Sequence, residues 1–300
     1  MTARPEWTAR PERGSAWLLR LMIRISQAAG RPLARVLLWP ITGYFWLATP
    51  RVRADSRRYL ARALGRAPTT IDVLRHYHTF SATVLDRVYL LSGRVEAFDV
   101  RVHGEAQIRA ALADGHGAFL VGAHFGSFEA LRAAGRQQAG IRVTMAMFEN
   151  NARTIGRFLR QIDPSLAMDI IALGSLDSML HVQQRLDRGD CVGFLADRAF
   201  GVDTTIDVPF LGEPAPFPTG AFRMAAVLRR PVLLMVGVYR GGNRYDLHIE
   251  PLADFSRIER GARGQAQEAA VRAYAARLEH YCHDAPYNWF NFYDFWQRTP

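Results

Sequence analysis

The sequence predicts an α/β fold in which a mostly parallel central sheet is flanked by helices. Residues 15–92 have mainly helical patterns, and from about residue 100 short apolar runs alternate with helical ones. Such alternation is typical of layered α/β domains with parallel strands. With 300 residues, 49% of them hydrophobic, the chain is long enough to bury one substantial core.

The individual elements follow from this alternation. The expected strands cover 118–123, 141–148, 169–173, 191–197, 231–240 and 245–252. The expected helices cover 105–113, 127–138, 152–161, 175–188, 219–229 and 265–283. The connection 198–220 is long and rich in Pro and Gly, yet it carries the apolar residues Phe200, Phe210, Leu211 and Phe217. We therefore expect a lid or pocket wall there rather than a disordered surface loop.

Positive charge is concentrated near the N-terminus. Every basic residue is Arg; residues 1–66 hold thirteen of them against three acidic residues, and residues 67–300 are neutral overall. We expect residues 1–14, which repeat TARPE, to be disordered. Residues 15–66 are expected to form a basic, apolar and helical membrane anchor, and residues 67–300 to form the α/β domain. The helical region 15–92 is expected to be broken near Gly30, Pro40, Pro50 and Pro68.

The anchor prediction rests on the uncharged run 36–50. Fifteen residues are fewer than the roughly 20 that a spanning helix needs, and Pro40 and Gly43 interrupt the run. Trp39, Tyr44 and Trp46 are of the types enriched at membrane interfaces. The arginines that flank it, among them Arg31, Arg35, Arg51 and Arg53, suit an anionic lipid surface. A spanning and an interfacial anchor both stay open, as does an ordinary buried helix.

Composition argues against several other classes. Cys191 and Cys282 are too few and too far apart for a disulfide framework, which favours a reducing compartment. His280 and His283 favour a helix end over a metal site, so we expect no metal. The neutral region 67–300 argues against a nucleic-acid surface. A Gly-x-Ser-x-Gly nucleophile elbow and a phosphate-binding loop are both absent from the sequence.

The stretch HFGSFE, residues 124–129, is the candidate site. If His124 ends a strand and Ser127 caps the next helix, Glu129 falls in the first helical turn, and the loop can fold the imidazole toward that carboxylate. Gly126 permits the tight backbone. A histidine held by a carboxylate is a general-base device, and ligands of open α/β sheets gather at the carboxyl ends of strands. From spacing alone, a structural histidine is an equal alternative.

This stretch resembles the His-x4-Asp/Glu motif of the glycerolipid acyltransferase superfamily, in the branch that contains the bacterial lipid A late acyltransferases. The blocks GDCVGFLADR (189–198) and VPFLGEPAPFPTGAFRMAAVLRRPVL (208–233) resemble that branch in the same order. The family more often has Asp-Gln where this chain has Asp197-Arg198. The resemblance covers about residues 15–298 and implies a glycerolipid acyltransferase-like layered fold.

The resemblance implies that His124, oriented by Glu129, removes a proton from an acceptor hydroxyl that attacks an acyl thioester without a cofactor. It implies substrate-binding roles for Asp197, Arg198, Phe217, Gly220 and Arg223. Backbone N–H groups near Gly220 are the expected oxyanion donors, helped by Arg198 or Arg223. Arg198 could instead support Asp197, and Arg223 could lie on a solvated helix face.

The donor implied by the resemblance is acyl carrier protein or acyl-CoA, and the acceptor is a lipid at the cytoplasmic face of the bacterial inner membrane. Lipid A enzymes usually end in several basic residues, whereas this chain ends in the aromatic stretch APYNWFNFYDFWQRTP. That difference favours a less anionic acceptor or an unusual acyl group such as an aryl polyene; alternatively, the tail simply packs on the core. A thioesterase-like hydrolase and a non-catalytic membrane-binding protein are the competing classes.

Overall fold

The computed structural model describes residues 16–130, 133, 141–148, 170–174, 176–199 and 203–297. Its helices are α1 (Ala16–Ala48), α2 (Pro50–Leu64), α3 (Thr70–Leu91), α4 (Glu105–Ala111), α7 (Leu176–Asp187), α8 (Gly220–Leu228) and α9 (Arg263–Asp284). Its strands are β1 (Asp99–His103), β2 (Phe119–Gly122), β3 (Val143–Phe148), β4 (Ile170–Leu173), β5 (Cys191–Leu195), β6 (Thr205–Phe210), β7 (Glu213–Pro218), β8 (Pro231–Gly241) and β9 (Arg244–Asp254). Short 3-10 helices cover Val95–Ala97, Arg260–Ala262 and Pro286–Asn288.

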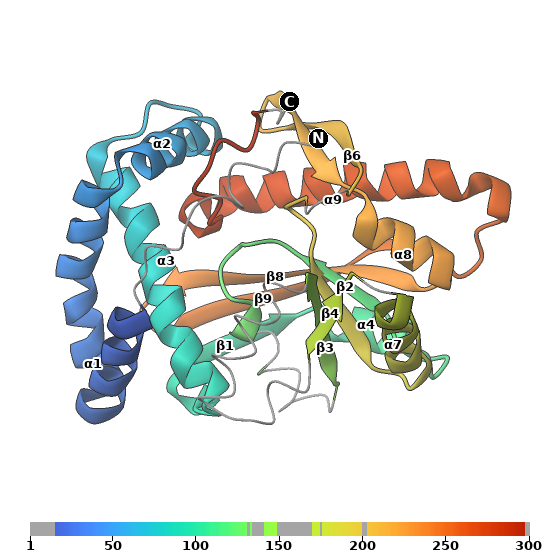
Figure 1. Ribbon diagram of the computed structural model, residues 1–300, viewed down its shortest axis with the longest axis horizontal. Coiled ribbons are helices and arrows are strands. Elements are labelled where there is room, and N and C mark those ends of the chain that lie inside the picture. Colours follow the sequence, from blue (N-terminus) through green and yellow to red (C-terminus); the bar gives the residue numbers. More distant parts are fainter. Residues whose placement is uncertain are drawn as a thin grey trace.

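The centre of the molecule is a mostly parallel sheet. Within the described residues it has seven strands, in the order β1-β9-β8-β2-β5-β3-β4 (Figure 1). Neighbouring strands are parallel except β8 and β9, which form an antiparallel pair. The predicted α/β class is confirmed. Because β2, β3, β4, β5 and β8 run the same way, the segments that follow them emerge at one edge, where such sheets bind ligands.

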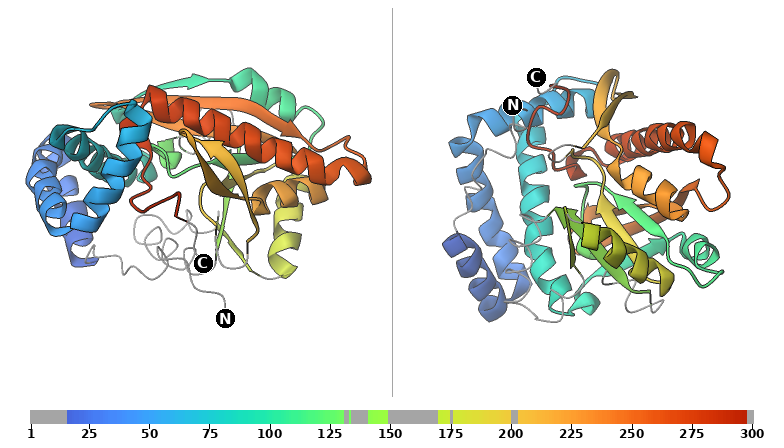
Figure 2. Two further views of the ribbon diagram at one scale, coloured as in Figure 1. Left: turned by 90° about the horizontal axis from the view of Figure 1, so that it is seen from above. Right: turned by 45° about the vertical axis from the view of Figure 1, so that its right-hand side comes forward.

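Both faces of the sheet are covered by helices. Along β8, alternate side chains point to opposite faces, as the strand pleat requires. Leu234 and Val236 belong to a buried cluster that includes side chains of α7, α8 and α9. Leu233 and Met235 belong to the cluster on the other face, with side chains of α1, α3 and α4. Helices α1, α2 and α3 stand together beside one end of the sheet (Figure 2).

The N-terminal helices begin and bend at residues that the sequence marks. Helix α1 kinks at Gly30, whose φ is 75°, but it continues through Pro40. Helix α2 begins at Pro50, a position where a missing N–H costs nothing. Thr69 starts α3 with a capping box, in which its hydroxyl accepts from the backbone N–H of Asp72. The predicted helical character is confirmed, but the predicted break at Pro40 is wrong.

Two arginines of α1 point into the protein rather than toward an outer surface. Arg31 donates to both carboxylate oxygens of Asp86 on α3, at 2.8 and 2.9 Å, and Arg35 donates to the hydroxyl of Tyr239 on β8 at 2.6 Å. Asp86 is fully buried, so this pairing clamps α1 to the domain. Of the helices described, none combines the length and the apolar character that crossing a membrane requires.

The long connection predicted at 198–220 contains a β-hairpin. Strands β6 and β7 pair in antiparallel register, with Ile206 opposite Phe217. Alternate residues such as Phe210 and Phe217 are fully buried, and the hairpin packs on α9. The apolar residues of this connection therefore form the buried face of a hairpin, which explains why the segment is more apolar than a solvated loop. Strand β1 was also not expected, while the predicted helix 152–161 and most of 127–138 lie outside the described residues.

Candidate active site

Two neighbouring strands bring a histidine and a carboxylate together. Strand β2 ends at Gly122 and β5 at Leu195, and these two residues lie opposite each other in the sheet. His124 and Asp197 each follow two residues beyond those strand ends, and the Ala196 N–H continues the pairing to the Gly122 carbonyl at 2.9 Å. Equal offsets on paired parallel strands place the two side chains at the same edge.

The imidazole of His124 is bound to Asp197. Its Nδ1 lies 2.8 Å from Asp197 Oδ1, and the backbone N–H of His124 donates to Asp197 Oδ2 at 3.0 Å. The carboxyl group is fully buried, whereas the histidine side chain is 27% exposed. An ionised carboxylate only accepts hydrogen bonds, so Nδ1 carries the proton and Nε2 is left as the basic nitrogen.

The charges of this pair follow from burial and from neighbours. Burial lowers the pKa of His124 below its ordinary value and the nearby Arg198 guanidinium lowers it further, against the opposing effect of Asp197. Burial by itself would raise the pKa of Asp197, but the His124 ring, Arg198 and the His124 N–H outweigh it and lower that pKa to about 2. At neutral pH the site therefore holds a neutral imidazole beside a carboxylate.

Glu129, expected to hold the imidazole, has other partners. Its Oε1 lies 2.7 Å from Nε of Arg87 on α3, and the Ser127 hydroxyl is 3.5 Å from its Oε2. Among the described contacts, the carboxylate on the imidazole is that of Asp197. Sequence spacing pointed to the nearest acid in the chain, but the sheet brings a distant acid closer because β2 and β5 are adjacent.

The turn between His124 and the following helix forms as expected. Ser127 caps that helix by accepting from the Ala130 N–H at 3.2 Å, which confirms the predicted N-cap. Gly126 has φ of 56°, and a Cβ there would meet the Gly237 carbonyl oxygen of β8 at 1.8 Å. Only glycine fits this close approach, which lets the backbone turn back toward the sheet.

Residues 8–298 match the family model of the bacterial lipid A biosynthesis acyltransferases. This chain belongs to that family. The match spans nearly the whole sequence and includes both His124 and Asp197. Among curated proteins, no sequence matches the chain. The chain is thus an acyltransferase, and its family acts in acyl transfer to a lipid.

The other residues predicted for the site have contacts within the protein. Arg198 donates through Nε to Asn291 Oδ1 at 2.7 Å and through Nη2 to the Phe290 carbonyl at 3.0 Å, so its observed contacts fit the supporting role beside Asp197. The Gly220 N–H, expected to be an oxyanion donor, is bonded to the Asp203 carboxylate. Arg223 Nη2 is 3.7 Å from Asp203 as well. Phe217 is fully buried in the core.

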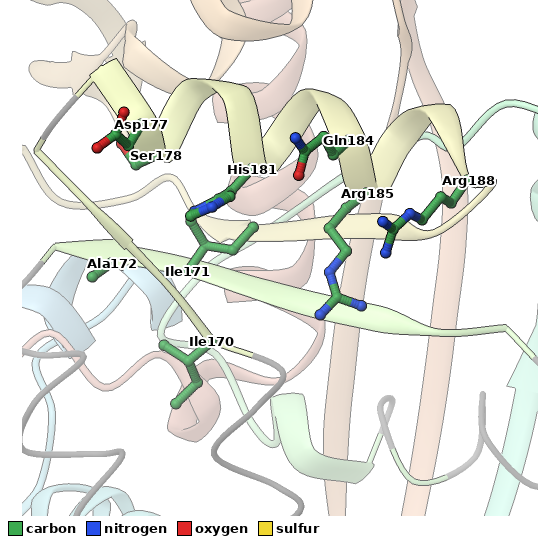
Figure 3. A pocket seen from close by; sticks show the side chains of 9 residues that line it. All are labelled: Ile170, Ile171, Ala172, Asp177, Ser178, His181, Gln184, Arg185 and Arg188. Carbon is green, nitrogen blue, oxygen red and sulfur yellow. The ribbon is translucent and has the colours of Figure 1, made fainter.

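A cavity of about 500 Å³ lies away from these residues, between β4 and α7 (Figure 3). Its lining includes His181, Gln184 and Arg185 of α7 and Arg188 of the turn that follows the helix. Arg185 is held by Asp190 at 3.2 Å. None of the predicted site residues lines this cavity. Across the described ranges, no group of three or more His, Cys, Asp or Glu side chains is placed to hold a metal ion.

Two side chains that the sequence analysis did not select for this candidate site also bind Asp197. Trp289 donates its indole N–H to Asp197 Oδ2 at 3.0 Å, and Asn291 donates its amide to the same oxygen at 3.1 Å. Both come from the aromatic stretch near the C-terminus. No local pattern points to them, because their contact with Asp197 depends on how the chain returns to the sheet after α9.

Proposed function

We propose that the chain transfers an acyl group from a thioester donor to a hydroxyl group of a lipid acceptor, with His124 as the general base. The observation that carries the proposal is the His124–Asp197 pair at the carboxyl edge of the sheet, in a chain of the lipid A biosynthesis acyltransferase family. Among the described contacts of the 27%-exposed imidazole, Nδ1 makes the hydrogen bond, which leaves Nε2 for a substrate, and the lowered pKa keeps the base neutral at neutral pH.

In the proposed reaction, Nε2 of His124 takes the proton of the acceptor hydroxyl while that oxygen attacks the thioester carbonyl. The tetrahedral intermediate then collapses, the C–S bond breaks, and the proton on Nε2 passes to the leaving thiolate. The products are an ester and a free thiol. Asp197 holds the ring in one tautomer and stabilises the imidazolium that forms between the two proton transfers.

The donor and the acceptor are proposed by class. The donor is the thioester of acyl carrier protein or of CoA, and the acceptor is a lipid A-like or another bacterial glycolipid. Trp289 and Phe295 of the aromatic tail are buried and Asp294 is paired with Arg58 at 2.8 Å, so these residues pack on the protein, as the alternative for the tail expected. An acceptor that takes an aryl polyene or another unusual acyl group is the alternative within the same chemistry.

We propose that α1 lies on the membrane that holds the acceptor, at the cytoplasmic face of the bacterial inner membrane. One side of the helix is buried through Ala34, Leu38 and Thr42. The other side exposes large apolar residues in a continuous stripe: Leu33, Val36, Trp39, Tyr44 and Leu47. A helix with one packed face and one exposed apolar face suits the plane of the interface, and lipid is the occupant that a lipid-modifying enzyme requires.

The first test compares purified wild type with His124→Ala. Each is given a radiolabelled acyl carrier protein thioester or acyl-CoA together with bacterial membrane lipids, and the products are separated. We expect label in a lipid band with wild type and a loss of at least about a hundredfold in the variant, because a general base contributes roughly that much or more. Label released as free fatty acid instead would indicate a thioesterase. Equal transfer by both proteins would remove His124 as the base.

A further inference from the structure

The segment Asn288–Asn291, which we call the C-terminal strap, lies across the loop that carries His124. Its backbone forms an isolated antiparallel bridge between Trp289 and Phe125. The Phe290 N–H donates to the His124 carbonyl at 2.7 Å, and the Gly126 N–H donates to the Asn288 carbonyl at 2.8 Å. The strap therefore fixes the backbone of this loop from His124 to Gly126, beside the proposed base.

The side chains of the strap reach the carboxylate of Asp197. Trp289 Nε1 and Asn291 Nδ2 both donate to its Oδ2, as does the backbone N–H of His124. Three donors on Oδ2 leave Oδ1 for Nδ1 of the imidazole. Because Trp289 is fully buried and Asn291 is 1% exposed, water does not compete for these bonds.

Each strap side chain is itself held in place. The Arg198 side chain binds Asn291 Oδ1 at 2.7 Å, which orients the amide so that its NH₂ faces Asp197. The Trp289 ring packs edge-on against Tyr59, Phe210 and Phe295. The Asn288 side chain accepts from the Tyr239 N–H and donates to the Tyr239 carbonyl, which anchors the strap to β8.

We infer that Trp289 and Asn291 are positioning residues of the acyl-transfer reaction, which hold the Asp197 carboxylate so that Oδ1 faces Nδ1 of His124. This inference rests on the proposed role of His124 as the base. The aromatic C-terminal stretch thus has a function in the site in addition to its packing in the core. Neither residue touches the reacting atoms; each acts through Asp197.

If the two residues position Asp197, replacing either should change the pKa of His124. Donors to Oδ2 disperse the charge of the carboxylate, and removing one leaves more charge to stabilise the imidazolium. Trp289→Phe removes the indole N–H and keeps an aromatic ring, so the pKa of His124 should rise by about a few tenths of a unit. Asn291→Asp adds a second negative charge beside the pair, so the pKa of His124 should rise by about one unit.

The experiment follows the ring carbons of ¹³C-labelled histidine by NMR across pH, with His124 assigned by its loss in His124→Gln. Trp296→Phe is the matched control, because it also removes an indole N–H and keeps an aromatic ring, but Trp296 donates to the Phe210 carbonyl and not to Asp197. We expect both strap variants to raise the pKa of His124 and to lower kcat about tenfold or more with little change in KM. Trp296→Phe should leave both quantities as in wild type.

The outcomes separate the inference from the proposed function. Folded Trp289→Phe and Asn291→Asp proteins whose His124 titrates as in wild type would overturn the positioning role, whatever their stability. A shift of His124 in Trp296→Phe as large as that in Trp289→Phe would overturn it too. A clear shift in the strap variants together with a wild type that transfers no acyl group would support the positioning of the pair and contradict the proposed reaction.

Discussion

At the scale of single residues, the proposed base depends on which carboxylate binds Nδ1 of His124. A carboxylate bound to Nδ1 selects the tautomer in which Nε2 is free, and a carboxylate elsewhere on the loop does not. The structure gives this contact to Asp197 at 2.8 Å and pairs Glu129 with Arg87 at 2.7 Å. Because the two carboxylates have different partners, removing the charge of one or of the other should change kcat by different amounts.

The comparison of Asp197→Asn with Glu129→Gln tests this difference. Both changes replace a carboxylate by an amide of the same shape. We expect Asp197→Asn to lower kcat on the order of a thousandfold, because the amide no longer stabilises the imidazolium or selects its tautomer. Glu129→Gln should lower kcat by less than about tenfold. Initial rates of thiol release and of lipid product, measured on both, check the expectation.

Thermal unfolding of both variants is the control, since Asp197 is fully buried and its loss also affects stability. An equal or larger loss of kcat in Glu129→Gln would return the orienting role to Glu129. The arrangement with Asp197 on Nδ1 would then not be the one that performs the reaction.

Among the secondary-structure elements, α1 shows how one helix combines two surfaces. Its inner side carries Arg31 and Arg35, which bind Asp86 and Tyr239, and small or apolar residues that pack on α3. Its outer side carries the apolar stripe. Arg31 and Arg35 are thus bound inside the protein, and between Leu33 and Leu47 the outer face of α1 carries no charged side chain, which suits lipid.

The double variant Val36→Glu, Leu47→Glu tests the proposed membrane contact. The two side chains are 64% and 68% exposed, so the change costs little in the folded protein. We expect binding to phospholipid vesicles that contain phosphatidylglycerol to fall about tenfold or more, because the free energy of burying either side chain in an apolar phase exceeds about 1.4 kcal/mol. Co-sedimentation measures it.

Val227→Glu provides the comparison. Val227 is 54% exposed on α8, outside the stripe, and the substitution adds the same kind of charge. Unchanged vesicle binding of the α1 double variant, or an equal loss in Val227→Glu, would contradict a membrane contact through this face of α1.

In the molecule as a whole, segments far apart in the sequence meet behind the site. Ser56 of α2 bonds to His76 Nδ1 at 2.8 Å, and His76 Nε2 bonds to the Trp289 carbonyl at 2.8 Å. The carbonyl only accepts, so Nε2 carries a proton, and in the neutral ring Nδ1 then accepts from the Ser56 hydroxyl. Burial lowers the pKa of His76 to about 4.

This buried histidine predicts a loss of stability in acid. In the unfolded chain its pKa is about 6.5, so between pH 6.5 and 4 the unfolded state binds the proton that the folded state does not, and stability falls as pH falls. The shift lowers the free energy of unfolding by about 3 kcal/mol between pH 7 and 4. Urea unfolding at a series of pH values measures it.

His76→Gln removes the titrating group while keeping an amide donor for the Trp289 carbonyl. Its free energy of unfolding should therefore depend less on pH over the same interval, by a similar amount. A pH dependence identical to that of wild type would mean that His76 does not titrate upon unfolding as the buried contacts require.

Local sequence was sufficient to predict the secondary structure that carries the site. Alternating apolar and helical runs predicted β2, β5 and β8, and Ser127 and Gly126 predicted the turn after His124, because propensity, capping and backbone freedom are local properties. The order of the sequence blocks around His124 and Asp197 also indicated the family. Local patterns missed β1 and the β6/β7 hairpin, whose strand character depends on packing against β9 and α9.

Which groups meet at the site depends on the tertiary structure. Asp197 contacts His124 because β2 and β5 are neighbours in the sheet, although 73 residues separate the two. Trp289 and Asn291 reach Asp197 because the chain returns to the sheet after α9. Such contacts join residues far apart in sequence, and the free energy that brings them together comes from burying the whole core. A short stretch of sequence therefore cannot predict them.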